Sequence, residues 1–171
     1  MSGSAGRVVV GVDDSLGSLE ALRRAVDVAR ATQRCLEIVR VWKPSVCSYS
    51  KVDFSITNWQ IARREQHYLD EAIARALGAR PVDLDVRTHV RGWEGNAGRV
   101  LSFIASREDD LLVLGSSHRR LLFWMRPSSV GRYCVRHVRC PLLVVPLPTL
   151  ARTLGNRAYY GKRLVRSLTT G

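Results

Sequence analysis

Short runs of Val, Leu and Ile recur along the chain and predict the strands of a buried sheet. Four of them are continuous enough for strands that are covered on both faces, as in a parallel sheet. They span Val8 to Val12, Leu36 to Trp42, Leu111 to Leu114 and Leu142 to Val145. A fifth run, Val82 to Val90, alternates apolar with charged residues and predicts a half-exposed strand at an edge of the sheet.

Between these runs, apolar residues recur at steps of three and four, the spacing of a helix that buries one face. The inward positions of the four expected helices are Leu19, Leu22, Ala25, Val26 and Ala29; Leu69, Ala72, Ile73, Ala76 and Leu77; Val100, Leu101, Ile104 and Ala105; and Val130, Cys134 and Val138. A turn containing Ser15 can start the first helix, and Asn96 can cap the third. Gly78 ends the second, and Ser128 and Ser129 precede the fourth. The alternation of strands and helices predicts an open α/β sheet with helices on both faces.

The composition limits the number of domains and excludes several classes of protein. With 171 residues, 46% of them apolar and 25% charged, the chain has material for the core of one domain. Disordered, collagen-like and disulfide-scaffold proteins are excluded, and a two-domain enzyme needs a longer chain. We expect a disordered N-terminus over 1–6, a domain over 7–146 and a flexible basic tail over 147–171.

The positive charge is concentrated toward the C-terminal end. The chain carries 27 Lys and Arg against 15 Asp and Glu, a net charge of +12, and all the acids lie before residue 111. The last 61 residues hold 11 of the basic residues, among them Arg163 and Arg166 in a tail that also holds Tyr159 and Tyr160. These residue types predict contact with nucleic acid or with an acidic protein, and an anionic membrane surface would explain the same charge.

The cysteines predict neither a metal site nor a disulfide framework. Cys35, Cys47, Cys134 and Cys140 match no zinc-binding spacing, and no secretion signal precedes them, so we expect reduced structural thiols. No apolar stretch approaches the roughly 18 residues that span a bilayer. A cytoplasmic protein without a membrane span is expected.

The first predicted strand runs into a turn with two carboxylates and a hydroxyl, Asp13-Asp14-Ser15. In open α/β sheets, ligands bind at the carboxyl ends of the strands where the strand order reverses. Asp13 can accept a hydrogen bond from a ribose or hold a magnesium ion. The alternative is that Asp13 and Ser15 only cap the following helix, and the pattern alone leaves both interpretations open.

The strand that begins at Leu111 is followed by a second polar segment, Gly115 to Arg120, and by a loop that reaches Ser128 and Ser129 at a helix start. Backbone amides in such a turn and at a helix N-terminus bind anions, because they have no partner within the helix. A surface loop with ordinary caps is the alternative. The apolar run from Leu121 to Met125 predicts either a lid over the cleft or a contact surface.

Two segments resemble the universal stress protein family. They are the opening Val8 to Ser15 and the stretch Leu111 to Val145, in which His137 precedes Cys-Pro and a Leu/Val run. The resemblance covers about residues 7 to 146 and implies a Rossmann-like, five-stranded parallel sheet in the order 3-2-1-4-5. It implies that Asp13 lies beside Gly115 across one cleft. It also implies a homodimer formed through the last strand, whose unpaired edge invites a partner strand.

The nucleotide loop of the family is degenerate in this chain. Nucleotide-binding members carry a glycine, two residues, a second glycine, nine residues, and then glycine followed by Ser or Thr. Gly115 matches the first glycine, His118 stands at the second, and Ser128-Ser129 replaces the final pair. A His in a left-handed backbone costs about 1–2 kcal/mol, and its ring fills space that the phosphates need. The loop is therefore similar to that of the UspA-type branch, which lacks the nucleotide motif.

The resemblance implies a regulatory or binding module in stress response that binds ATP weakly, with Mg²⁺ if it binds, between the first and fourth strands. The residues assigned to the nucleotide are Asp13, Ser15, Val41, Leu114, Gly115, His118, Arg119, Ser128, Ser129 and Val130. The residues assigned to partners are Leu142, Val144, Arg163 and Arg166. The sequence holds no catalytic constellation or metal-ligand set, and Gly11 to Ser15 lacks the glycine pair of the related nucleotide hydrolases. We therefore expect no catalysis beyond slow ATP hydrolysis.

Overall fold

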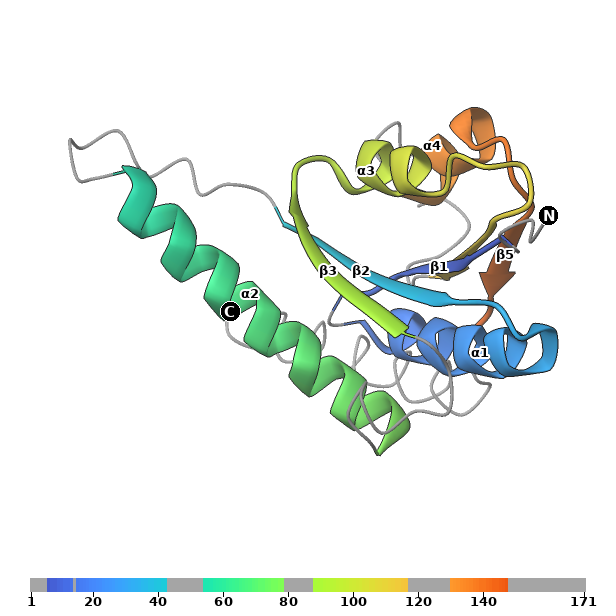
Figure 1. Cartoon of the computed structure of the whole chain (residues 1–171), viewed down its shortest axis with the longest axis horizontal. Helices are drawn as coiled ribbons and strands as arrows, with labels where there is room; N and C mark the ends of the chain where they lie inside the picture. The colour runs from blue at the N-terminus through green and yellow to red at the C-terminus, as the bar shows by residue number, and fades with distance from the viewer. Residues whose placement is uncertain (1–5, 14, 43–53, 79–87, 117–129, 148–171) are drawn as a thin grey trace, which may run out of the picture.

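The computed structural model describes residues 6–13, 15–42, 54–78, 88–116 and 130–147, in which strands and helices alternate (Figure 1). The elements are β1 (Val8–Gly11), α1 (Leu16–Thr32), β2 (Leu36–Trp42), α2 (Phe54–Leu77), β3 (Thr88–Glu94), α3 (Ala97–Ile104), β4 (Leu111–Gly115), α4 (Val130–His137) and β5 (Leu142–Val145). The α/β class is confirmed.

The strands form a five-stranded sheet in the order β3-β2-β1-β4-β5, with every neighbouring pair parallel. The central strand β1 aligns Val8 with Leu36 of β2 on one side and with Leu111 of β4 on the other. The carboxyl ends of β1 and β4 therefore lie side by side. In such folds a ligand site is expected at the carboxyl ends of neighbouring strands.

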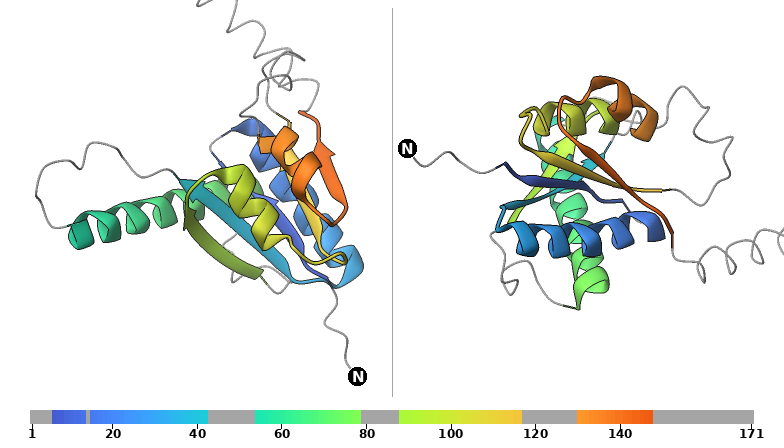
Figure 2. Two further views of the ribbon diagram at one scale, coloured as in Figure 1. Left: turned by 90° about the horizontal axis from the view of Figure 1, so that it is seen from above. Right: turned by 90° about the vertical axis from the view of Figure 1, so that its right-hand side faces the viewer.

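Helices cover both faces of the sheet, α1 and α2 on one and α3 and α4 on the other (Figures 1 and 2). Alternate residues of β1 serve the two layers: Val8 and Val10 pack in the core with α1 and α2, whereas Val9 packs with α3 and α4. All three are fully buried. This double burial is the reason that the strand reads as an uninterrupted apolar run.

The helix boundaries follow local side-chain chemistry. Ser15 is the N-cap of α1 and accepts a hydrogen bond from the Ser18 N–H at 3.2 Å, and Asn96 caps α3 by accepting from the Arg99 N–H at 3.3 Å. Gly78 follows the last residue of α2 with a φ of +65°, a left-handed conformation that stops a helix. The predicted start of α1, cap of α3 and end of α2 are confirmed.

The predicted end of the third strand is wrong. The strand spans Thr88–Glu94, whereas the alternation predicted Val82 to Val90, of which residues 82–87 lie outside the described part. Each residue of β2 from Leu36 to Trp42 pairs with one residue of β3, so the register is set by the full length of β2. Periodicity within the third strand could not reveal that pairing. Its place at the edge of the sheet is confirmed.

Gly6 and Leu147, which flank the predicted domain, both pack against it. Gly6, which we assigned to a disordered N-terminus, is buried, and a side-chain carbon there would overlap the carbonyl of Asp109. Leu147, which we assigned to the tail, is 5% exposed, and its N–H donates to Ser116 Oγ at 3.2 Å. Residues 1–5 and 148–171 lie outside the described part.

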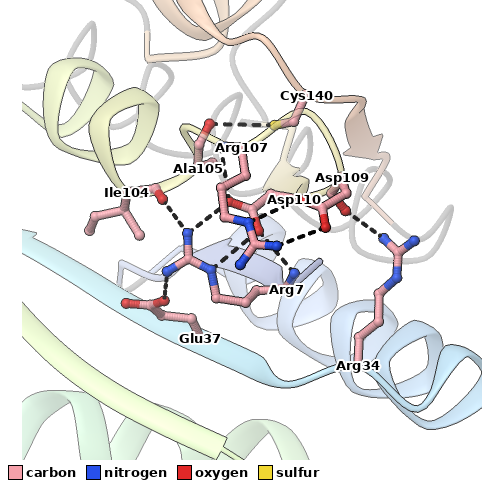
Figure 3. A network of polar contacts seen from close by, with 9 residues as sticks. All are labelled: Arg7, Arg34, Glu37, Ile104, Ala105, Arg107, Asp109, Asp110 and Cys140. Atoms are coloured by element: carbon pink, nitrogen blue, oxygen red, sulfur yellow. Dashed lines mark hydrogen bonds and ion pairs between the residues drawn. The ribbon is translucent and has the colours of Figure 1, made fainter. Parts of the chain in front are cut away.

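A polar network ties the amino-terminal ends of three strands together (Figure 3). Arg7 lies directly before β1. Its Nη2 donates to Oδ2 of Asp110, which lies directly before β4, at 2.7 Å, and its Nη1 donates to Oε2 of Glu37 in β2 at 2.8 Å. Nη2 also donates to the carbonyl of Ile104 at 2.7 Å. Asp110 and Glu37 are 1% and 4% exposed. The network joins β1, β2 and β4 at their amino-terminal ends, opposite to the expected ligand site at the carboxyl ends.

Burial affects the titration of several groups. Burial alone would raise the pKa of Asp110, but the hydrogen bonds and the charge of Arg7 outweigh it and hold that pKa below its usual value. Burial raises the pKa of the Cys134 and Cys140 thiols, which form no disulfide. Both are therefore poor nucleophiles, in agreement with the structural role expected for them. Cys47 lies outside the described part of the chain.

Candidate functional site

A cavity of about 230 Å³ opens at the carboxyl ends of β1 and β4. Its apolar lining comes from strands on both sides of β1 and from the helices above them, and consists of Val12, Val39, Val41, Leu101, Leu114, Val130 and Val144. Its polar and small lining residues are Gly11, Asp13, Ser15, Ser18, Ala97, Gly115, Ser116 and Gly131. The cavity therefore combines an apolar floor with a small polar rim, the composition that orients a mostly flat, apolar ligand with a few polar groups.

The N-termini of three helices meet at this cavity. Ser15 caps α1, Ala97 is the first residue of α3, and Val130 and Gly131 begin α4, and all four line the cavity. The first turn of a helix has backbone N–H groups without partners within the helix, and the helix dipole is positive there. The described part of the lining contains no Lys or Arg. The helix ends therefore supply its positive potential.

Asp13 has one carboxylate oxygen in use and one available. Its Oδ1 accepts a hydrogen bond from the Ser15 N–H at 2.9 Å, which holds the turn between β1 and α1. Its Oδ2 has no hydrogen-bond partner among the described residues, and the side chain is exposed. Asp13 thus stabilises the turn and can still accept a hydrogen bond from a ligand hydroxyl. Ser15 uses its hydroxyl oxygen as the cap of α1.

The shape of the cavity depends on a close approach of α1 to β4. A side-chain carbon at Gly115, the last residue of β4, would overlap the carbonyl of Gly17 in the first turn of α1. A side-chain carbon at Gly17 would in turn overlap the carbonyl of Ser116. Backbone therefore packs directly on backbone at this point, and the approach brings the Asp13–Ser15 turn to the end of β4.

Comparison with known proteins identifies the family. A profile described as the universal stress protein family matches residues 5–146. The chain belongs to this family. Universal stress protein MJ0531 of Methanocaldococcus jannaschii is 22% identical to it over 143 residues, which are 83% of this chain and 82% of the relative.

Solved structures of universal stress proteins share the fold. UspA from Lactobacillus plantarum matches with a TM-score of 0.61 at 20% identity, over 84% of this chain and 99% of the other. A universal stress protein in complex with cAMP matches with a TM-score of 0.57 at 21% identity, over 85% and 99%. An Arabidopsis thaliana member with AMP bound matches with a TM-score of 0.53 at 13% identity, over 84% and 93%.

In this universal stress protein, the fold brings six of the predicted nucleotide residues together around the cavity. They are Asp13, Ser15, Val41, Leu114, Gly115 and Val130. The other four, His118, Arg119, Ser128 and Ser129, lie outside the described residues, as does the apolar run Leu121 to Met125. The juxtaposition of Asp13 with Gly115 arises because β1 and β4 are parallel neighbours.

The two predicted partner residues of β5 have inward-facing side chains. Leu142 packs in the core with α3 and α4, and Val144 lines the cavity, so neither side chain is a contact that projects from the sheet edge. Their backbone groups do face that edge. The Pro141 carbonyl accepts from the Leu112 N–H of β4 and the Val145 carbonyl from the Ser116 N–H just beyond β4, and successive residues of a strand direct their backbone groups to opposite sides. The other two predicted partner residues, Arg163 and Arg166, lie outside the described part.

Sequence reasoning missed several lining residues of the cavity. Val39 precedes the predicted Val41 by two positions and therefore faces the same side of β2. Ala97 follows the predicted cap Asn96, so its place at a helix N-terminus could have been used to find it. Leu101 was assigned to the core, and it reaches the cavity from one turn further along α3.

Neither a metal centre nor a membrane span is found in the described part of the chain. No three side chains of His, Cys, Asp or Glu gather there closely enough to hold a metal ion. None of the described helices is long and apolar enough to cross a bilayer. His137 is the last residue of α4, where its Nδ1 donates to the Tyr133 carbonyl at 2.8 Å. It therefore satisfies a carbonyl of the last turn, as its position late in the helix predicts.

Proposed function

We propose that the cavity binds an adenine nucleotide and that the protein is a regulatory binding module of the stress response. The observation that carries this proposal is the meeting of the Asp13 carboxylate with three helix N-termini over an apolar floor. Support also comes from universal stress proteins of the same fold that hold cAMP or AMP. We place this function in the cytoplasm.

The cavity offers a distinct group for each part of a nucleotide. The apolar side chains of Val39, Val41 and Leu101 suit the flat base, and Asp13 Oδ2 suits a ribose hydroxyl. The first turn of α4 suits the phosphates, and we assign Arg119, which precedes α4 in the sequence, to them as an added cation. Mg²⁺ would arrive with ATP, because Asp13 is the single carboxylate in the described part of the lining.

The test is titration with ATP, AMP and cAMP, with and without Mg²⁺, monitored by calorimetry and by the intrinsic fluorescence of the four tryptophans. We expect Asp13→Ala to weaken binding by about tenfold or more, because a hydrogen bond to a charged group contributes about 1.5–3 kcal/mol. The matched control is Asp27→Ala, which removes the same charge from an exposed position of α1.

Equal binding by the wild type and the Asp13→Ala variant would show that Asp13 does not contact the nucleotide. Failure of every nucleotide to bind up to millimolar concentration would overturn the nucleotide function itself. We propose binding rather than turnover, so little phosphate should be released in the ATP samples. Phosphate release that disappears in Asp13→Ala would instead make the protein a nucleotide hydrolase.

We also propose a homodimer through the edge of β5 that pairs with no described strand. This strand pairs with β4 on one side, and the N–H and C=O groups of Leu142 and Val144 point to the other. Solution scattering at high protein concentration should give a dimer mass. Val144→Pro, which removes an edge N–H, should give a monomer, whereas Val144→Ala should remain a dimer. A monomer mass for the wild type would refute this proposal.

The nucleotide function is favoured over binding of nucleic acid or an acidic partner through the tail. The residues that would carry the nucleotide converge on one cavity, with geometry that the structure describes. The tail residues Arg163 and Arg166 have no comparable support, because they lie outside the described residues.

A further inference from the structure

The outer surface of α3 and α4 carries arginines without partners beside exposed apolar side chains. Arg99 of α3, Arg136 of α4 and Arg139, two residues beyond the end of α4, are exposed, and their side chains form no hydrogen bond or ion pair with any described residue. Phe103 is 72% exposed and Val135 is 61% exposed, which is unusual for side chains of this size. We call the surface formed by Arg99, Phe103, Arg136 and Arg139, together with Tyr133 and His137, the α3–α4 face. Val135 lies two residues from both Tyr133 and His137 and therefore projects from another side of α4.

The two helices form one continuous surface. Arg99 and Phe103 are four residues apart and therefore share a side of α3. Tyr133 packs against Gly98 so closely that a side-chain carbon at Gly98 would lie 2.8 Å from the Tyr133 Cβ. Further along, Ser102 Oγ contacts Cys134 Sγ at 3.8 Å. Figures 1 and 2 show the pair side by side over the sheet, with no other described element on their outer side.

The aromatic part of this face is held in place before any partner arrives. The rings of Tyr133 and His137 stack with centroids 3.9 Å apart and planes 11° apart. His137 Nδ1 donates to the Tyr133 carbonyl at 2.8 Å, which fixes the imidazole ring. A side chain that is already fixed loses little conformational entropy when it is covered, which favours binding.

The helices of the face carry no acidic residue. Neither α3 nor α4 contains an Asp or Glu, and of the two acids that follow the end of α3, Asp109 is held by Arg107 at 2.9 Å and Glu108 is exposed. The opposite helical layer differs, because it contains acidic residues that pair with arginines. Arg23 pairs with Glu20, both in α1, at 2.9 Å, and Glu65 of α2 pairs with Arg40 of β2 at 2.8 Å. Positive potential therefore gathers on the α3–α4 side of the described molecule.

We propose that the α3–α4 face docks an acidic protein segment whose carboxylates surround an aromatic or aliphatic side chain. Its composition is that of a protein interface, which is enriched in aromatic residues and Arg and depleted in Lys, Glu and Asp. Arg99, Arg136 and Arg139 would pair with the carboxylates, and Phe103 and Tyr133 would contact the apolar side chain. A second copy of the chain is disfavoured on this face, because two such faces repel each other.

The probe is a fluorescein-labelled peptide of glutamates flanking a central Phe-Leu pair, and its counterpart with Gln in place of every Glu. Binding to the full chain is followed by fluorescence anisotropy. We expect the acidic peptide to bind and Arg136→Ala to weaken it by about tenfold, the effect of one lost charge-assisted contact. Phe103→Ala should weaken it as well, while nucleotide binding by both variants stays at the wild-type value. Arg24→Ala is the matched control, since it removes the same charge from an exposed position of α1 on the other side of the sheet.

Three results would overturn the proposal. The acidic peptide fails to bind, or its Gln counterpart binds as well, or Arg24→Ala weakens binding as much as Arg136→Ala, so that only net charge matters. An oligothymidine that binds more tightly than the peptide, with the same sensitivity to Arg136 and Phe103, would assign the face to single-stranded nucleic acid instead. Because every variant carries residues 148–171, differences between variants report on the face and not on the tail.

Discussion

Asp110→Asn is expected to lower the free energy of unfolding by about 3 kcal/mol, the lower end of the cost of removing one partner from a buried ion pair. The lower end applies because the Arg7 side chain remains 28% exposed, whereas that of Asp110 is fully buried. Asp110 accepts from the backbone N–H, Nε and Nη2 of Arg7 and from the Arg107 N–H. Asn has one side-chain oxygen in place of two, so it cannot accept all of these hydrogen bonds, and its NH₂ group would face an N–H donor of Arg7 or Arg107.

The measurement is urea and thermal unfolding of the variant, and the midpoint temperature should fall by about 10 °C. Asp109→Asn is the control, because the neighbouring residue also binds an arginine, at 2.9 Å from Arg107 Nη2, but at the surface. Exposed pairs of this kind contribute about 0–1 kcal/mol. Equal losses for the two variants would show that Asp110 has no special role in holding the strands together.

The same carboxylate predicts a pH dependence of stability. The pKa of Asp110 is lowered in the folded protein, so the ionised form stabilises the fold. That contribution is complete above the unfolded value of about 3.9 and is lost as the pH falls through the lower folded value. Wild-type stability should therefore drop as the pH falls below about 3.9, and Asp110→Asn should show a shallower acid limb. Parallel acid limbs for the two proteins would contradict the assignment.

The buried strands could be predicted well because each is marked by a continuous apolar run in the local sequence. The runs Leu36 to Trp42 and Leu142 to Val145 coincide with β2 and β5, since both faces of each strand are covered and few polar residues interrupt them. The third strand could not be placed in this way. Its bounds depend on pairing with β2, from Leu36 with Thr88 to Trp42 with Glu94. Such a register is set by tertiary contacts.

The same difference between local and long-range information applies to the two ends of the strands. Asp13 and Gly115 could be placed near each other because the resemblance to the family implied that the first and fourth strands are parallel neighbours, and the two residues lie at the carboxyl ends of these strands. The Arg7 network could not, because Arg7 and Asp110 are 103 residues apart and neither belongs to a local motif. Glu37 was the feature of the sequence that could have indicated this network. A carboxylate within the buried run of β2 requires a cationic partner, but the sequence does not name it.

Gly115→Ala is expected to lower the free energy of unfolding by about 2–3 kcal/mol, in the range for overpacking a closely packed position. The added carbon would overlap the carbonyl of Gly17, and backbone atoms cannot turn aside as a side chain can. The first turn of α1 must move, and Asp13 and Ser15 at its start must move with it. Nucleotide affinity should therefore fall along with stability, as measured by unfolding and by the titration with ATP.

Gly11→Ala is the matched control for the glycine substitution. Gly11 lines the same cavity, but its added carbon would meet the Leu101 Cδ1 atom at 2.8 Å, the end of a flexible side chain. Leu101 can rotate away, so the cost should remain below about 1 kcal/mol, the usual limit for substitutions that a site can absorb. If both glycine variants lost the same stability, backbone contact between α1 and β4 would not be the cause.

The combination of Gly17→Ala with Gly115→Ala distinguishes one shared contact from two separate ones. Both added carbons press on the same junction, Gly17 against the Ser116 carbonyl and Gly115 against the Gly17 carbonyl. Once one substitution has moved α1 away from β4, the second has less to displace, so the double variant should lose less than the sum of the single losses. Gly98→Ala disturbs the α3–α4 contact at Tyr133 in the other layer, and its loss should add to that of Gly115→Ala. Sub-additivity confined to the Gly17 and Gly115 pair would make this junction the element that couples the stability of the fold to the shape of the cavity.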